Sequence, residues 1–213
     1  MTAREAIFSR VRTALGRQAG QPVPPPPVWP LDAGSAGVPE RVDLFRRSLE
    51  ALNGKVVLVH SQAEAGAAVA AILDGRTAVA SPSPFLESCG INRIERVRWG
   101  ISDPEEWRQS CAAADAGITS AAYALADTGS LVMIASPSEP RLASLLPPLH
   151  IAVIPAASIL TGLEELFLTV PEPAKLSPSM VLITGPSRTA DIEQILVRGV
   201  HGPGEVHVVV VQS

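Results

Sequence analysis

From about Pro39 to the end of the chain, short apolar runs alternate with amphipathic segments whose apolar residues recur at helical spacing. The apolar runs predict strands at Val56–Val59, Thr77–Ala80, Arg96–Trp99, Ser130–Ile134, Ile151–Ile154, Met180–Thr184 and Val206–Val211. The amphipathic segments predict helices at Pro39–Leu52, Gln62–Leu73, Pro104–Ala113, Ser120–Ala126, Ser158–Leu168 and Thr189–Val197. The proline-containing stretch Val170–Ser179 predicts a surface loop. Continuous apolar strands that alternate with helices indicate an α/β fold with a mostly parallel sheet covered on both faces.

The first 38 residues follow a different pattern. Ile7, Val11 and Leu15 are spaced for one face of a short helix over Thr2–Leu15. The segment Gln21–Pro30 is rich in proline, so it favours an extended, stiff conformation that cannot supply sheet hydrogen bonds. We therefore divide the chain into an N-terminal helix with a Pro-rich linker, residues 1–38, and an α/β domain, residues 39–213.

Composition fits a single globular domain, because 46% of the 213 residues are hydrophobic and only 18% are charged. No apolar run approaches the roughly 20 residues that a membrane-spanning helix needs. The N-terminal segment interleaves charges with apolar residues and lacks the apolar core of a signal peptide. We therefore expect a cytoplasmic protein without a membrane span.

Charge and cysteine content exclude further classes. The net charge is −4 and the Lys and Arg residues are scattered, so the sequence shows no basic patch for nucleic acid. Cys89 and Cys111 lie far apart and have no neighbours at metal-ligand spacing. We expect both to be ordinary buried thiols, with no disulfide, zinc or iron–sulfur site.

The end of the predicted strand Met180–Thr184 is the first candidate site. A turn at Gly185 and Pro186 follows it, and the next helix is predicted to begin with Thr189 as its cap. In a parallel α/β sheet such strand-to-helix loops bind ligands. Arg188 can hold a carboxylate or phosphate with two hydrogen bonds, or it can pair locally with Asp191. The predicted binding residues of this loop are Thr184, Gly185, Ser187, Arg188 and Thr189.

Three further loops carry candidate chemistry. His201 precedes the turn Gly202-Pro-Gly204, and it either acts as an acid or base, with Gly202 near the ligand, or bonds backbone groups of the turn. Asp127 stands at a turn before a strand, where it serves as a nucleophile or base or else forms an Asx turn. Arg141 is a candidate anion ligand, with a solvated arginine at a helix start as the alternative.

The chain resembles the LutC/YkgG family of LUD-domain proteins, which are associated with lactate utilisation. The resemblance covers roughly Pro39–Ser213 and is carried by an ordered set of motifs. These are Gly117-Ile-Thr, Ala126-Asp-Thr-Gly-Ser130, Arg141 with Ser144-Leu-Leu-Pro-Pro148 and His150, Ile183-Thr-Gly-Pro-Ser-Arg-Thr-Ala-Asp-Ile-Glu193, and Gly199-Val-His-Gly-Pro203. Where the family commonly has Glu-Thr-Gly-Thr, this chain has Asp127-Thr-Gly-Ser130.

The resemblance implies a three-layer α/β/α sandwich similar to the sugar-phosphate isomerase and CoA-transferase superfamily. It also implies a role beside iron–sulfur lactate-utilisation proteins in the oxidation of L-lactate to pyruvate. Because the chain lacks cysteine clusters, we expect no cofactor of its own and a non-redox subunit that binds a small carboxylate or other anion. The alternatives are a stand-alone isomerase or acyl/CoA-transferase-like enzyme, with Asp127 as base and Arg141 and Arg188 on the anion, and an interaction module. In the interaction module, the N-terminal arm would dock a partner or a second copy in a homo-oligomer.

Overall fold

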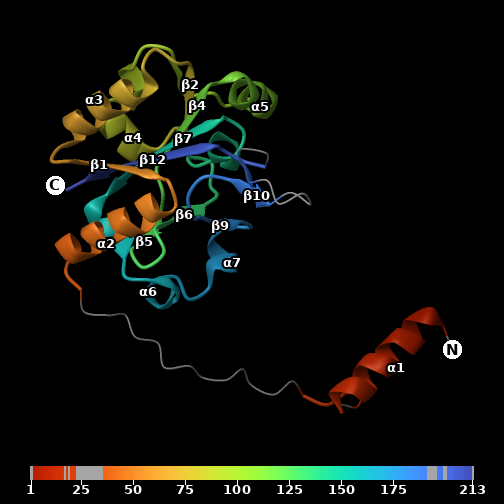
Figure 1. Ribbon diagram of the computed structural model, residues 1–213. Helices are drawn as coiled ribbons and strands as arrows, with labels where there is room; N and C mark the ends of the chain where they lie inside the picture. Colours follow the sequence, from red (N-terminus) through yellow and green to blue (C-terminus); the bar gives the residue numbers. More distant parts are fainter. Residues whose placement is uncertain are drawn as a thin grey trace. The chain divides into compact units, whose positions relative to one another are not determined.

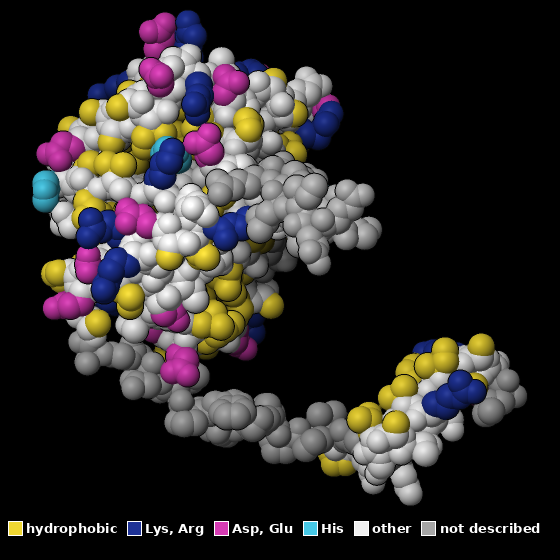
Figure 2. Space-filling view, viewed as in Figure 1, with side chains coloured by type: hydrophobic (Ala, Val, Ile, Leu, Met, Phe, Trp, Pro, Cys, Tyr) yellow, Lys and Arg dark blue, Asp and Glu magenta, His cyan; other side chains and the backbone are white. Residues whose placement is uncertain are grey.

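The computed structural model describes residues 2–16, 18, 20–22, 36–190, 196–198 and 201–212, and the chain forms two units, residues 1–30 and 31–213. The first contains helix α1 (Ala3–Leu15), which confirms the predicted N-terminal helix. Thr2 and Glu5 form its capping box, and Gly16 ends it in the left-handed conformation. None of its residues is buried, and its exposed apolar side chains include Ile7, Val11 and Leu15 (Figure 2). Residues 23–35, which hold most of the Pro-rich segment, lie outside the described residues.

The second unit is built on a six-stranded, fully parallel sheet with the strand order β1-β12-β7-β4-β2-β3. The strands are β1 (Lys55–Val59), β2 (Ala78–Ala80), β3 (Val97–Arg98), β4 (Ala116–Thr119), β7 (Leu149–Pro155) and β12 (Glu205–Val211). β12 lies between β1 and β7, with Val208 opposite both Val56 and Ala152. This sheet confirms the predicted α/β class.

Successive residues of the central strands point to opposite faces and enter different cores, as strand geometry requires. Val209 and Ile151 face helices α3 (Gln62–Leu73) and α4 (Pro84–Ser88), with the short 3₁₀ helix η1 (Ile91–Arg93) alongside. Val208 and Ala152 face α2 (Val38–Ala51) and a second, smaller sheet. Figure 1 shows the resulting three layers, with α3 and α4 on one side of the parallel sheet and α2 with β5 and β6 on the other.

The β2 end of this second face is covered by α5 (Pro104–Ala113) and the 3₁₀ helix η2 (Arg141–Ser144). Val79 of β2 packs there against Trp107, Cys111 and Ala143. The approach of η2 to β4 depends on Gly117, because a Cβ at this position would lie 1.7 Å from the Ala143 carbonyl oxygen. A residue without a side chain is therefore needed at this point of β4.

The second sheet has four strands in the order β8-β5-β6-β9. They are β5 (Tyr123–Leu125), β6 (Ser130–Ile134), β8 (Ile159–Leu160) and β9 (Met180–Ile183), and β6 runs antiparallel to both β5 and β9. Around them lie the 3₁₀ helix η3 (Ala156–Ser158) and the short helices α6 (Leu163–Thr169) and α7 (Pro173–Leu176). Strands β10 (Arg188–Ala190) and β11 (Leu196–Arg198) form a separate antiparallel pair.

Several predictions of individual elements were wrong, and strand β4 was not among the predicted strands. The segment Ser120–Ala126 is not a helix but leads into strand β5, where pairing with β6 overrides the helix propensity of its alanines. The predicted helix Thr189–Val197 is replaced, in its described residues, by β10 and β11. Met180–Ile183 is a strand as predicted, but its partner is antiparallel β6 and not a strand of the parallel sheet.

Two boundaries also differ from prediction. Ser158–Leu168 is helical only from Leu163, because Ile159–Leu160 first pairs with β5 as β8. The predicted loop Val170–Ser179 contains the single turn of α7. None of the helices in the described part of the chain is long and apolar enough to cross a membrane.

Candidate functional site

The strand order of the parallel sheet identifies one position for a ligand site. From β2 the chain moves outward to β3, whereas from β4 it moves in the opposite direction, to β7 and then β12. β2 and β4 are neighbours, with Ala80 opposite Ile118. In open α/β sheets, ligands bind outside the carboxyl ends of the strands at such a switch point. The loops that follow Ala80 and Thr119 are therefore the first place to look for chemistry.

A pocket of about 380 Å³ lies at this position, and we call it the switch-point pocket. Its polar lining includes Ser83 after β2, Ser120 after β4, and Glu139. Its apolar lining includes Tyr123 of β5 and Met133 of β6, so both sheets contribute. A pocket of this size, with apolar walls and a few convergent polar groups, is typical of small-molecule sites.

Glu139 is held in place by its backbone and by one carboxylate oxygen. Its backbone N–H and C=O pair with Ser136 across a tight turn at 3.1 and 3.2 Å. Its Oε1 accepts hydrogen bonds from the Ser120 backbone N–H at 3.1 Å and from the Ser120 hydroxyl, which is itself 3.0 Å from the Ser83 hydroxyl. The other oxygen, Oε2, is buried, and the side chains of Ser81 and Ser83 also interact with this carboxyl.

Burial raises the pKa of the Glu139 carboxyl above its usual range, and hydrogen bonds from serines, Ser120 first, oppose this rise. A carboxyl group with a raised pKa is a better proton acceptor than an ordinary surface carboxylate. An ionised carboxylate accepts hydrogen bonds from O–H or N–H groups of a ligand. The arrangement therefore suits a ligand that donates to Glu139.

Behind this pocket, His150 and Thr119 form a buried pair across β7 and β4. The His150 Nε2 is 2.9 Å from the Thr119 hydroxyl oxygen, and the imidazole is fully buried. Burial lowers the pKa of His150 to about 4, so the ring is neutral near pH 7. The sequence motif that ends in His150 thus supplies a neutral buried side chain that holds the last residue of β4.

Most of the residues predicted from sequence gather at the opposite, amino edge of the sheet. α2 ends just before β1, and the residues around its end contact two of the predicted loops, those that carry Arg188 and Asp127. Gly185 has a φ of +84°, and a Cβ built on it would lie 3.2 Å from the Cβ of Leu52. The Arg188 guanidinium donates a hydrogen bond to the Leu52 carbonyl oxygen. Arg188 is exposed, and its alternative partner Asp191 lies outside the described residues.

Hydrogen bonds from hydroxyl and backbone groups connect the remaining predicted loops to one another and to α2. The Thr184 hydroxyl is 2.8 Å from the Ser130 hydroxyl, and the Asp127 carbonyl oxygen accepts from the Ser48 hydroxyl of α2 at 3.2 Å. The Ser187 N–H donates to the Pro203 carbonyl at 2.9 Å, which brings the 184–188 loop beside Gly202 and the exposed His201. These loops approach one another at the amino edge of the sheet, and not at a carboxyl edge, where the sequence analysis placed a strand-to-helix ligand site.

Two predicted residues have other surroundings. Arg141 begins η2 two positions after Glu139, its side chain is exposed, and it has no ion-pair partner in the part of the chain that the structure describes. Thr189 does not cap a helix, because it lies within β10 opposite Val197. The described residues also contain no group of three or more His, Cys, Asp or Glu side chains placed to hold a metal ion.

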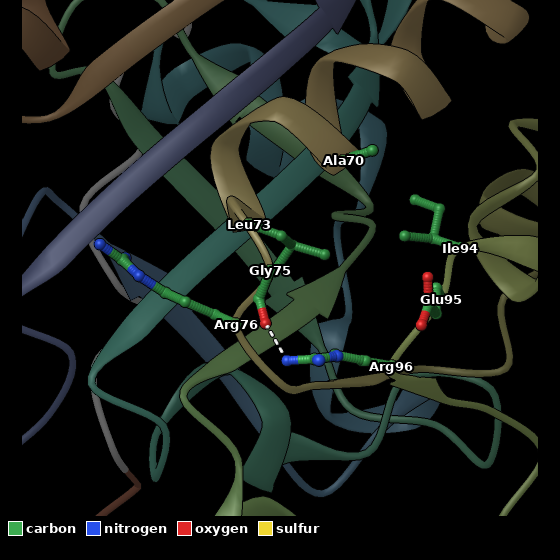
Figure 3. Close-up of a pocket in the computed structure, with 7 residues that line it drawn as sticks. All are labelled: Ala70, Leu73, Gly75, Arg76, Ile94, Glu95 and Arg96. Carbon is green, nitrogen blue, oxygen red and sulfur yellow. Dashed lines mark hydrogen bonds between the residues drawn. The ribbon is translucent and has the colours of Figure 1, made fainter.

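A second hollow, of about 430 Å³, lies at the amino ends of β2 and β3 and is lined in part by Arg76, Glu95 and Arg96. Its two arginines do not converge on a ligand position. Arg96 donates to the Gly75 carbonyl oxygen at 2.9 Å, and Figure 3 shows the Arg76 guanidinium extending away from the other lining residues. The switch-point pocket is therefore the stronger candidate.

Comparison with known proteins identifies the family. Residues 42–211 match the LUD domain. The chain belongs to the LUD domain family. Over 186 residues it is 31% identical to lactate utilization protein C of a Geobacillus species, a match that covers 76% of this chain and 77% of that protein. It is 41% identical over 119 residues to lactate utilization protein C of an Exiguobacterium species, where the match covers 54% of this chain and 52% of the relative.

The chain spans about half the length of the first of these curated relatives that it matches. A solved structure supports the fold of this LUD domain independently. A DUF162 family protein from Deinococcus radiodurans superimposes with a TM-score of 0.63 at 21% identity, covering 83% of this chain and 99% of the other. At this level of identity the likeness establishes the fold alone.

The pocket residues of this LUD domain were missed from sequence, although some left a signal. Both β2 and β4 are short strands that are followed directly by a serine, as Ala78–Ser81 and Ala116–Ser120 show. Recognition of β4 as a strand would have placed Ser120 beside Ser83. Glu139 left no comparable signal, because it reaches the pocket through the turn at Ser136 that follows the antiparallel strand β6.

Proposed function

We propose that this LUD-domain protein is a lactate-utilisation protein that supports the oxidation of L-lactate to pyruvate beside iron–sulfur partner proteins. The observation that carries the proposal is the match to lactate utilization protein C over 186 residues, which covers about three quarters of both chains. The ordered motifs at 117–130, 141–150 and 183–203 support the same assignment.

The assignment of the electron carriers to partner proteins follows from the cysteine ligands that iron–sulfur clusters need. Oxidation of lactate to pyruvate releases two electrons and two protons, and iron–sulfur clusters that carry electrons are commonly held by four cysteine thiolates. This sequence has two cysteines, and both are buried. Burial raises the pKa of Cys111 to about 11 and also raises that of Cys89, which disfavours the thiolate form that binds metal. The electron carriers are therefore assigned to the partner proteins.

Deletion of the gene from its host tests the role. We expect the deletion strain to lose growth on L-lactate as sole carbon source, to keep growth on pyruvate, and to recover on lactate when the wild-type gene is restored. Purification of a tagged chain from lactate-grown cells should bring down proteins that contain iron and labile sulfide. Unchanged growth of the deletion strain on L-lactate would refute the proposal.

A further inference from the structure

We propose that the switch-point pocket binds a small molecule with a hydrogen-bond donor at one end, a hydroxyl or a protonated amine, and an apolar body about the size of an aromatic ring. The same pocket excludes carboxylate anions, lactate included. This inference concerns a ligand other than lactate, and it stands or falls independently of the growth phenotype on lactate.

The donor requirement comes from Glu139. Glu139 is the one charged residue among those that line the pocket, and the N–H and hydroxyl of Ser120 hold its Oε1. A carboxylate in a partly buried site is stabilised by a ligand that donates a hydrogen bond to it, and such charge-assisted hydrogen bonds are stronger than those between neutral groups. A protonated amine or a hydroxyl can do so, whereas a carboxylate has no proton to donate.

The apolar residues that line the pocket determine the apolar part of the proposed ligand. Tyr123, Met133 and Ile134 come from the antiparallel strands β5 and β6, and Val170 follows α6. An aromatic side chain and a thioether both make favourable contacts with a ring. The volume of about 380 Å³ is in the usual range for organic ligands and is larger than lactate needs.

Charge explains the exclusion of anions. None of the residues that line the pocket is Lys or Arg, so a carboxylate would meet no counter-charge there. Glu139 would repel it, because like charges close together in a partly buried site are unfavourable. Arg141 is near in sequence but its side chain is exposed, and it is not one of the lining residues.

Three probes that share a phenyl ring separate these requirements: benzylamine, benzyl alcohol and benzoate. Each is titrated into the full-length protein at pH 7 while backbone amide shifts near Ser120 and Tyr123 are followed by NMR, with L-lactate as a fourth titrant. We expect the wild type to bind benzylamine and benzyl alcohol at these positions and to bind neither benzoate nor L-lactate. Glu139→Gln should weaken benzylamine by about tenfold and admit benzoate, because the charge is removed while the side-chain shape is kept.

Glu50→Gln is the matched control, because Glu50 is an exposed glutamate of α2 that does not line the pocket. It should leave the order of the three probes as in the wild type. The proposal is overturned if benzoate binds the wild type as well as benzylamine does, if no probe shifts the pocket amides, or if Glu139→Gln leaves the order unchanged. The wild-type order alone decides the matter should Glu139→Gln fail to fold.

Discussion

Replacement of Gly117 by alanine tests the contact on which the approach of η2 to the sheet depends. Gly117 lies in β4, where the Ala143 carbonyl occupies the space of a side chain. A Cβ built there would lie 1.7 Å from Ala143 O, 2.7 Å from Ala143 C and 3.1 Å from the Cγ of Pro147. The first two contacts are with backbone atoms, so no rotamer change can relieve them.

The size of the effect follows from these distances. Ordinary contact begins at 3.4 Å, so Ala143 O would have to retreat by about 1.7 Å. Overpacking of a core commonly costs about 1–3 kcal/mol and occasionally more. Because the clash here involves backbone of a buried turn, we expect about 3 kcal/mol, which for a domain of this size lowers the melting temperature by roughly 6–12 °C. η2 begins two residues after Glu139, so benzylamine binding should weaken as well.

Thermal unfolding followed by circular dichroism measures this change, and Gly90→Ala is the control. Gly90 has a φ of +74° and no atom within 4 Å of its built Cβ, so alanine there carries only the backbone penalty of about 1–2 kcal/mol. Gly117 has no positive φ, so its variant carries the clash alone, whereas Gly90→Ala shows what a positive φ costs without a clash. If Gly117→Ala melts no lower than Gly90→Ala, the reasoning about η2 and β4 is refuted.

Three further outcomes follow from the geometry. Burial lowers the pKa of His150 from 6.5 to about 4, so the neutral ring contributes fully to the free energy of unfolding above about pH 6.5, and this contribution is lost as the pH falls toward 4. Urea unfolding should show that the free energy of unfolding falls by about 2–3 kcal/mol between pH 7 and 4.5, and that His150→Gln reduces this fall. The same pH dependence in the variant and the wild type would contradict this prediction. Burial raises the pKa of Cys111 to about 11 and that of Cys89 above its usual value, so a disulfide reagent at pH 8 should label neither thiol until the protein is unfolded, and rapid labelling of the native protein would show that a thiol is accessible. Arg188→Ala removes one exposed hydrogen bond to Leu52, so it should cost at most about 1 kcal/mol and leave calorimetric titration with L-lactate unchanged, whereas lost lactate binding would instead assign Arg188 to the anion.

The strands β12 and β7 could be predicted because they are long and buried on both faces, whereas the short central strand β4 was not predicted. Val206–Val211 and Ile151–Ile154 are continuous apolar runs, and they fall within β12 and β7. The antiparallel sheet could not be predicted in the same way. β5 is only Tyr123–Leu125, preceded by two alanines, and its strand state depends on pairing with β6 and β8 rather than on its own composition.

The site shows the same division between local and long-range information. The sequence selected the Arg188 and His201 loops as candidates, but the position expected for the Arg188 loop depended on the strand Met180–Ile183 joining the parallel sheet. It joins β6 instead, so the loop after it packs against the end of α2. Glu139 is the opposite case, because only the pairing of residues 136 and 139 brings it to Ser120.

The two groups of residues lie at opposite ends of the parallel sheet, and this separation limits what one ligand can do. Gly204, three residues after His201, donates to Pro148 at the amino end of β7, whereas Ser120 lies at the carboxyl end of β4. Ala116 lies opposite Leu149 and Thr119 opposite Ala152, so the two ends of β4 are three residues, about 10 Å, apart. A molecule as small as lactate cannot touch both ends. If both groups of residues act in lactate utilisation, they must therefore bind different molecules. The exposed Arg188 and His201 are more accessible to a partner protein, whereas Glu139, in the partly enclosed pocket, is suited to a small ligand.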